Sequence, residues 1–134
     1  MVTVNTFRGI PFFGSADVAS RCQQRLFQVA EQRGFDVLAY CFMPDHLHLL
    51  LQGSPDSKLV AFMQRFKQVT GYEFKRREGR PLWQRSYYDH VLRKDEDKRK
   101  LAEYIWNNPV RAGLAANSDE YPLSGPKGQV TGQT

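Results

Sequence analysis

The segment at residues 45–51, with the sequence DHLHLLL, contains His46 and His48, two of the three histidines of the chain. Side chains two residues apart on a strand point to the same face, so a strand here would present both imidazoles together. Leu47 and Leu49 would then fill the opposite face. Two imidazoles on one face are a natural pair of ligands for a divalent metal ion. The alternative is a pair of half-exposed strand histidines, because two ligands alone do not make a metal site.

The next position on the same face argues against one class of phosphate-processing enzyme. Histidine-triad nucleotide hydrolases require the pattern His-U-His-U-His-U-U, in which U is a bulky apolar residue and the third imidazole approaches the phosphate. Leu50 occupies the position of that third histidine. The pattern is therefore not that of a histidine-triad hydrolase.

A second polar pair lies in residues 101–109 (LAEYIWNNP), where Tyr104 and Asn108 are four residues apart. On a helix this spacing places both side chains on one face. A helical tyrosine is usually a core or interface residue, and an asparagine before a proline usually marks a helix end. The occurrence of both residues together with the histidine pair favours a catalytic role. A phenol needs proton loss or a nearby positive field to act as a nucleophile at neutral pH.

The elements that must hold these residues follow from apolar spacing and from Gly and Pro breakers. We expect strands over residues 2–8, 35–42, 46–51 and 87–92, and helices over residues 17–33, 55–76 and from 95–97 to Pro109, with Ser54 as the cap of the second helix. The order βαββαβα predicts an α+β, ferredoxin-like sandwich, an antiparallel sheet with helices packed on it. We expect one domain over residues 1–116 and a mobile, polar tail over residues 117–134.

Size and composition limit the class of protein. The 134 residues fit one domain, and 19 Lys and Arg against 14 Asp and Glu give a net charge of +5. This balance favours polyanionic partners, although an ordinary basic protein has the same charge. Cys22 and Cys41 form no CxxC pair, which suits a reducing cytosol and indicates neither a disulfide framework nor a thiolate zinc site. Apolar stretches are far shorter than the ~20 residues that a bilayer needs, so we expect no membrane partner.

Basic side chains are concentrated between the histidine segment and the fourth expected strand, and aromatic residues are interleaved with them. Basic groups can follow phosphates while aromatic rings stack on unpaired bases. The same residues could form a solvated helix end and turn. The candidate DNA-binding residues are Arg65, Lys67, Lys75, Arg76, Arg77, Arg80, Trp83, Arg85 and, near the end of the last helix, Arg111.

Four motifs in this order resemble the single-tyrosine HUH transposases, which are small enzymes of insertion sequences, and their domesticated relatives, the REP-associated tyrosine transposases. The motifs are YCFMPDHLHLLLQG at 40–53, FMQRFKQVTGYEFKRREGRPLWQRSYYDHVL at 62–92, YIWNNPVRAGL at 104–114 and EYPLSG at 120–125. The resemblance covers nearly the whole chain. His-U-His alone is a weak signal, but the ordered set is specific.

The resemblance implies a site and a reaction. His46, His48 and Asn108 would hold Mg²⁺ or Mn²⁺, and Tyr104 would attack single-stranded DNA beside a hairpin to form a 5′-phosphotyrosine. No nucleotide cofactor would be needed. His90, in YYDHVL, matches a non-catalytic position of the family. Such enzymes act in the bacterial cytosol, some as homodimers and some as monomers.

Two other interpretations remain. One is a nucleic-acid-binding domain derived from such a transposase and without turnover, although the presence of every presumed catalytic residue favours the enzyme. The other is a replication initiator or plasmid-mobilising relaxase, which shares the HUH chemistry. Those proteins commonly have the histidines and tyrosine in the opposite order, and the motifs YIWNNPVRAGL and WQRSYYDH point to the transposase branch.

Overall fold

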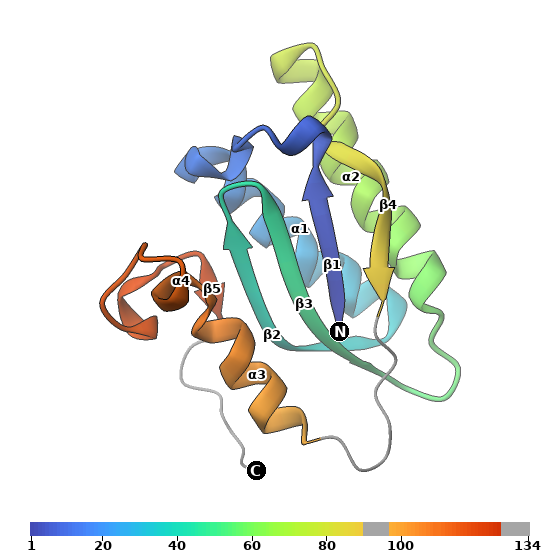
Figure 1. Cartoon of the computed structure of the whole chain (residues 1–134). Helices are drawn as coiled ribbons and strands as arrows, with labels where there is room; N and C mark the ends of the chain where they lie inside the picture. The colour runs from blue at the N-terminus through green and yellow to red at the C-terminus, as the bar shows by residue number, and fades with distance from the viewer. Residues whose placement is uncertain (90–96, 127–134) are drawn as a thin grey trace.

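The computed structural model describes residues 1–89 and 97–126, and its centre is a five-stranded antiparallel sheet in the order β4-β1-β3-β2-β5 (Figure 1). The expected ferredoxin-like βαββαβ arrangement is confirmed, with a helical segment and a short fifth strand added after it. The strands are β1 Val2–Thr6, β2 Phe35–Met43, β3 His46–Gly53, β4 Trp83–Asp89 and β5 Ser124–Gly125.

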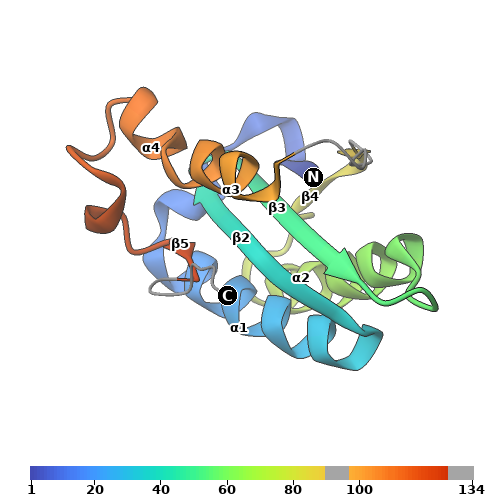
Figure 2. The same ribbon diagram turned by 90° about the horizontal axis from the view of Figure 1, so that it is seen from below.

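Two helices cover one face of the sheet, α1 at Ala16–Arg33 and α2 at Leu59–Glu78 (Figure 2). The Ser15 hydroxyl caps α1 by accepting a hydrogen bond from the Val18 amide, and Gly34 ends the helix with a left-handed φ of 74°. Between the helices and the sheet lies an aromatic and aliphatic core. Its fully buried side chains include Phe13, Leu26, Phe42, Leu47, Leu49, Phe62 and Phe66.

A third helix, α3 at Lys98–Trp106, packs on β2 and β3 from the other side of the sheet. Its apolar residues Ala102 and Ile105 are three apart, on one helical face, and they bury Cys41 and Leu50 in a second, smaller core. The strand β2 is therefore buried on both faces. The single-turn helix α4, Asn108–Arg111, follows directly.

Several predicted boundaries are wrong. Ser54 does not cap α2: its amide donates to the Ser57 hydroxyl in a turn, and Lys58 precedes the helix. The fourth strand begins at Trp83, earlier than predicted, because the Trp83 indole is anchored on α2. The first strand ends at Thr6, since a turn with Arg8 at φ 55° follows. The expected strand end at 90–92, with His90, and the expected helix start at 95–96 lie outside the described residues.

Asn107 interrupts the last helical segment, so α3 and Asn108 do not share one continuous helix. Pro109 stands in the first turn of α4, where its missing amide hydrogen costs nothing. The prediction of one helix that ends at Pro109 is therefore wrong, because α3 ends at Trp106 and Pro109 lies inside α4.

The tail predicted from residue 117 is wrong for residues 117–126. The Tyr121 hydroxyl donates to the Phe42 carbonyl at 2.6 Å, the Trp106 indole donates to the Gly125 carbonyl at 2.7 Å, and β5 pairs with β2. A few specific hydrogen bonds, without an apolar period, hold this segment on the sheet. Within the parts of the chain that the structure describes, no helix is long and apolar enough to cross a bilayer.

Candidate active site

The two histidines lie at the start of β3, on the face that α3 partly covers. Their ring centroids are 4.7 Å apart and the rings are nearly perpendicular, at 85°. Leu47 and Leu49 are fully buried on the opposite face, against α1 and α2. The predicted division of the strand between an imidazole face and a packing face is therefore confirmed. Leu50, in the place of a third histidine, is fully buried beneath α3.

Each imidazole is oriented by a hydrogen bond at Nδ1. The Thr3 hydroxyl lies 3.0 Å from His48 Nδ1, and a carboxylate oxygen of Asp45 lies 2.7 Å from His46 Nδ1. Nε2 is consequently the nitrogen of each ring that can coordinate a metal ion. In metal-binding histidines, the ring nitrogen that does not bind the metal commonly forms a hydrogen bond of this kind, which fixes the tautomer and the ring orientation.

The charge state of His48 also suits a ligand. Burial, with smaller effects of the neighbouring His46 and Arg111, lowers the pKa of His48 to about 4. Its imidazole is therefore neutral at neutral pH, which is the form that binds metals.

Within the described part of the chain, a third ligand would have to be of another type. Among residues 1–89 and 97–126, no cluster of three or more His, Cys, Asp and Glu side chains could hold a metal ion. An amide oxygen, such as that of Asn108, would complete a set of two nitrogens and one oxygen. This donor set, with room for phosphate oxygens, is compatible with Mn²⁺ and, less favourably, with Mg²⁺.

Tyr104 and Asn108 form a second cluster, organised by Arg111. The Arg111 guanidinium carbon lies 3.9 Å from the centroid of the Tyr104 ring, a cation–π contact. Its Nη2 donates to the Tyr104 carbonyl at 2.7 Å and to the Asn108 amide oxygen at 3.3 Å. Tyr104 is 53% exposed, so the phenol is accessible to a macromolecular substrate.

The positive charge of Arg111 also has a small lowering effect on the pKa of His48. No hydrogen bond between described side chains joins Tyr104 or Asn108 to the histidines. The structure thus brings the histidines together, and it brings Tyr104, Asn108 and Arg111 together, with α3 on the histidine side of the sheet.

The predicted DNA-binding residues are divided between different surfaces. Arg65, Arg76 and Arg77 line an open pocket formed by α1 and α2, together with the exposed Tyr72. These helices lie on the face of the sheet away from the histidines (Figure 2). Arg77 is paired with Asp17 at 2.6 Å. The remaining cations of this region, Lys75 and Arg80, are exposed at the C-terminal end of α2 and in the loop after it.

The edge of the sheet beside β4 carries two more of these cations. Lys67 donates to the carbonyls of Gln84 and Arg85 at 2.8 and 3.0 Å, and the Arg85 side chain is exposed. The prediction that Trp83 contacts DNA is wrong, because the ring is buried in the core and its indole donates to the Thr70 hydroxyl at 2.8 Å.

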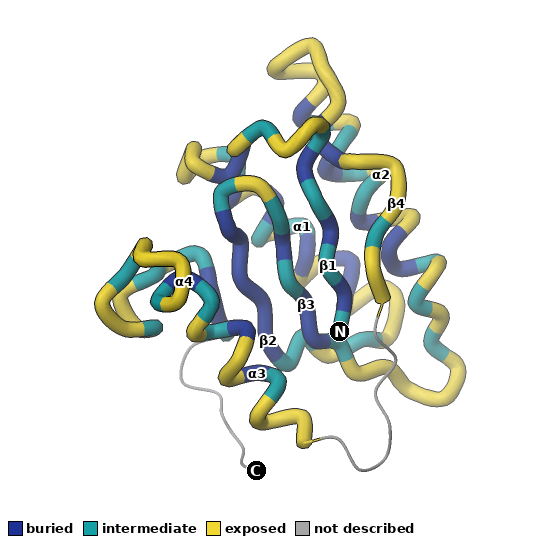
Figure 3. The backbone as a smooth tube through the Cα atoms, viewed as in Figure 1, coloured by how far each residue is buried: buried dark blue, intermediate teal, exposed yellow. Residues whose placement is uncertain are grey.

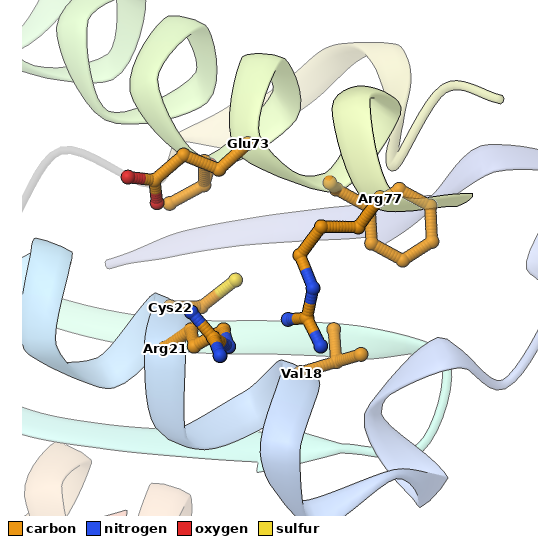
Figure 4. A pocket seen from close by; sticks show the side chains of 7 residues that line it. Val18, Arg21, Cys22, Glu73 and Arg77 are labelled. Atoms are coloured by element: carbon orange, nitrogen blue, oxygen red, sulfur yellow. The ribbon is translucent and has the colours of Figure 1, made fainter. Parts of the chain in front are cut away.

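A small pocket between α1 and α2 is not connected with this chemistry. Val18, Arg21, Cys22, Glu73 and Arg77 line it (Figure 4). Burial, with a smaller effect of Glu73, raises the pKa of the Cys22 thiol to about 12, so this thiol is not a nucleophile at neutral pH.

The fold and the site together define an α+β domain with a His-U-His strand and a tyrosine on the neighbouring helix. A family model described as "Transposase IS200 like" matches residues 7–108. The chain therefore belongs to the IS200-like transposase family.

Individual relatives agree with this assignment. A protein of Haemophilus influenzae is 28% identical over 109 residues, covering 72% of this chain and 62% of that protein. The REP-associated tyrosine transposase of Escherichia coli is 27% identical over 104 residues, covering 74% of this chain and 59% of that protein. The chain thus spans about three fifths of the length of these curated relatives. A solved structure of a REP-associated tyrosine transposase bound to a REP hairpin has the same fold, with a TM-score of 0.71 at 23% identity over 92% of this chain and 73% of that chain.

Sequence reasoning missed the residues that orient the site. Asp45 directly precedes the histidine segment, so its proximity to His46 was a usable signal. Thr3 is 45 residues from His48, and only the strand register brings them together. The central position of Arg111 in the tyrosine cluster likewise depends on the turn between α3 and α4.

Proposed function

We propose that this chain is the catalytic domain of a DNA strand transferase that cleaves and rejoins single-stranded DNA through a covalent 5′-phosphotyrosine on Tyr104. The observation that carries the proposal is the pair of oriented imidazoles, with His48 neutral, on the same side of the sheet as the tyrosine helix. Membership of the transposase family supports the same conclusion.

In the proposed reaction, the phenol oxygen of Tyr104 attacks phosphorus as its proton is lost, and the bond from phosphorus to the 3′ oxygen breaks. The 3′ oxygen takes up a proton and leaves as a hydroxyl, while the 5′ side remains attached to the tyrosine. A 3′-hydroxyl of another strand end reverses the step. The phosphodiester is conserved throughout, so no nucleotide cofactor is required.

His46, His48 and Asn108 would hold the divalent cation, Mg²⁺ or Mn²⁺. When bound, such a cation neutralises charge that develops on the phosphoryl oxygens. Asp45 and Thr3 keep the rings in position for it. Arg111 would bind a phosphate beside Tyr104, which is consistent with its exposure and its contact with the ring.

We infer that the substrate is single-stranded DNA next to a hairpin, by analogy with the solved REP-associated tyrosine transposase that is bound to a REP hairpin. Arg65, Lys67, Lys75, Arg76, Arg77, Arg80 and Arg85 remain candidates for contacts with DNA. Because these residues lie on the α2 surface and at the β4 edge, we propose that they contact DNA that flanks the cleavage site. Arg111 would instead lie beside the strand that is cleaved. A homodimer and a location in the bacterial cytosol also belong to this proposal.

The test is formation of a covalent adduct. The protein is incubated with end-labelled hairpin DNA that has single-stranded flanks, with Mg²⁺ or Mn²⁺, and the products are separated under denaturing conditions. We expect a denaturation-resistant protein–DNA adduct that Tyr104→Phe abolishes and that Tyr72→Phe, on the opposite side of the sheet, retains. Persistence of the adduct in Tyr104→Phe would refute the nucleophile assignment. Binding without an adduct under any metal would favour a nucleic-acid-binding domain without turnover.

A further inference from the structure

Half of the histidine face of the sheet has no helix over it among the described residues. α3 packs on β2 and β3, whereas β1 and β4 have α2 behind them and no described helix in front (Figures 1 and 3). The side chains of Thr3 and Asn5 are only half-buried on this side, in contrast to the buried Val2 and Val4 that face the core. An open strip of sheet therefore begins directly beside the histidines.

Tyr88 stands at the outer end of this strip. In the strand register Tyr88 is paired with Thr3, and Thr3 is paired with His48, so the three side chains point to the same face. Adjacent strands lie ~4.8 Å apart, which places the Tyr88 backbone roughly 10 Å from that of His48. The Tyr88 ring is 75% exposed, more than any other large apolar side chain in the described residues.

We propose that Tyr88 is a base-stacking subsite, on which an unpaired nucleobase of the DNA strand stacks as that strand enters the histidine site. The proposal rests on the proposed function for the identity of the strand. Stacked nucleotides rise ~3.4 Å each, so roughly 10 Å corresponds to a base about three nucleotides from the phosphate at the histidines.

The chemistry of the strip fits a base better than a protein partner. One exposed aromatic ring surrounded by the polar Thr3 and Asn5 is too small an apolar area for a stable protein interface, which buries about 800 Å² per partner. It is sufficient for one base, whose flat face stacks on an aromatic ring while its polar edge stays in contact with hydrogen-bonding groups. The net charge of +5 favours the approach of a nucleic acid. Other folds display aromatic rings on an open sheet for the same purpose.

The strand register also fixes the position of Tyr88 in the sheet. Tyr88 is held in the ladder with β1, and Tyr87, its neighbour, points to the other side and packs against the main core. The hydrogen bond between Thr3 and His48 lies between the tyrosine and the imidazole. A base stacked on Tyr88 would thus keep a constant distance from the reacting phosphate.

The test measures binding in a Tyr104→Phe background, where no covalent step interferes. The probe is a hairpin with a single-stranded oligothymidine flank, and its dissociation constant is measured by fluorescence anisotropy. We expect Tyr88→Ala to weaken binding about tenfold, within the range for loss of a stacking ring, and Tyr88→Trp to retain it. Phe27→Ala, which removes an exposed ring on α1 away from the candidate DNA-contacting residues, is the matched control and should leave the affinity unchanged.

An abasic scan of the flank locates the base. We expect one position within about three nucleotides of the cleaved phosphate where loss of the base weakens binding as much as Tyr88→Ala does, and where the two losses are not additive. Equal affinities of Tyr88→Ala and its parent, or base losses that are fully additive with it at every position, would overturn the proposal.

Adduct formation with Tyr104 intact separates this inference from the proposed function. If the adduct forms and Tyr88→Ala binds like the parent, the subsite is wrong and the transferase stands. If affinity depends on Tyr88 but no adduct forms under any metal, the transferase is wrong and the subsite stands. Tyr88 is mostly exposed, so its variants should fold, and the thermal unfolding midpoint checks this.

Discussion

The two faces of the sheet share the same strands but are built for different purposes. Behind the sheet, α1 and α2 enclose a core of aromatic and aliphatic side chains, including Phe42, Phe62 and Phe66. In front, α3 covers part of the sheet with a small core, and the polar residues His46 and His48 lie beside it, partly accessible. The well-packed core on the α1 and α2 side of the sheet thus supports the polar, partly accessible residues on the histidine side.

Neighbouring residues of β3 point to different faces, so substitutions at adjacent positions test the two faces of the sheet separately. His48→Ala removes a proposed metal ligand but no part of the main core. We expect adduct formation to fall by more than about 100-fold, since even loss of an outer-sphere partner costs 10–100-fold. Isothermal titration with Mn²⁺ should show a parallel loss of metal affinity. Retention of both properties would remove the histidine pair from the site.

Leu47→Ala, one residue earlier, should have the opposite result. The side chain is fully buried against α1 and α2, so its truncation leaves a cavity and should lower the free energy of unfolding by about 2–5 kcal/mol. The measurement is urea unfolding of the metal-free protein. The fraction that remains folded should form the adduct at the same rate as the parent. A slower rate in that fraction would mean that packing on the α1 and α2 side of the sheet also affects the rate of adduct formation.

The difference between the faces also explains what the sequence predicts well. Alternation with a period of two correctly assigned His46 and Leu47 to opposite faces, because local geometry alone decides it. The prediction of a helix over residues 17–33 was likewise close to α1, because the residues that bound this helix, Ser15 and Gly34, act locally on its ends.

Other features depend on tertiary register, which the sequence does not display. Trp83 sits among basic residues and seemed suited to DNA, yet its indole is directed to Thr70 on α2. Residues 117–126 lack an apolar period, but Tyr121 and Trp106 anchor them through single hydrogen bonds. Such contacts between distant segments leave no periodic signal.

Asp45 and Thr3 give a finer test of the front face, because they orient the imidazoles without binding the metal. We expect Asp45→Asn and Thr3→Val each to lower the affinity for Mn²⁺ by about 10- to 100-fold. Both side chains are at least partly exposed, so the thermal unfolding midpoint should change little. Asp36→Asn, on an exposed carboxylate at the start of β2, is the matched control. An unchanged affinity in both variants would mean that the hydrogen bonds at Nδ1 do not support metal binding.

The smallest expected effect concerns the cost of burying His48 in the metal-free protein. In an unfolded chain an imidazole has a pKa of about 6.5, whereas burial lowers the pKa of folded His48 to about 4. Between these values the unfolded state binds more protons, so the free energy of unfolding falls as the pH drops from 6.5 toward 4. Above pH 6.5, His48 is neutral in both the folded and the unfolded state, so the free energy of unfolding is no longer reduced by its protonation.

His48→Gln isolates this effect, because glutamine does not titrate and can keep a hydrogen bond to Thr3. Urea unfolding of both proteins with EDTA present, at several pH values from 7 to 4, gives the difference between them. We expect the free energy of unfolding of the parent to fall more steeply below pH 6.5 than that of the variant, by at most about 1.4 kcal/mol per pH unit, which corresponds to one bound proton. Parallel curves would mean that the ring is protonated in the folded state at ordinary pKa, and that the front face is as open to water at His48 as it is at Tyr88.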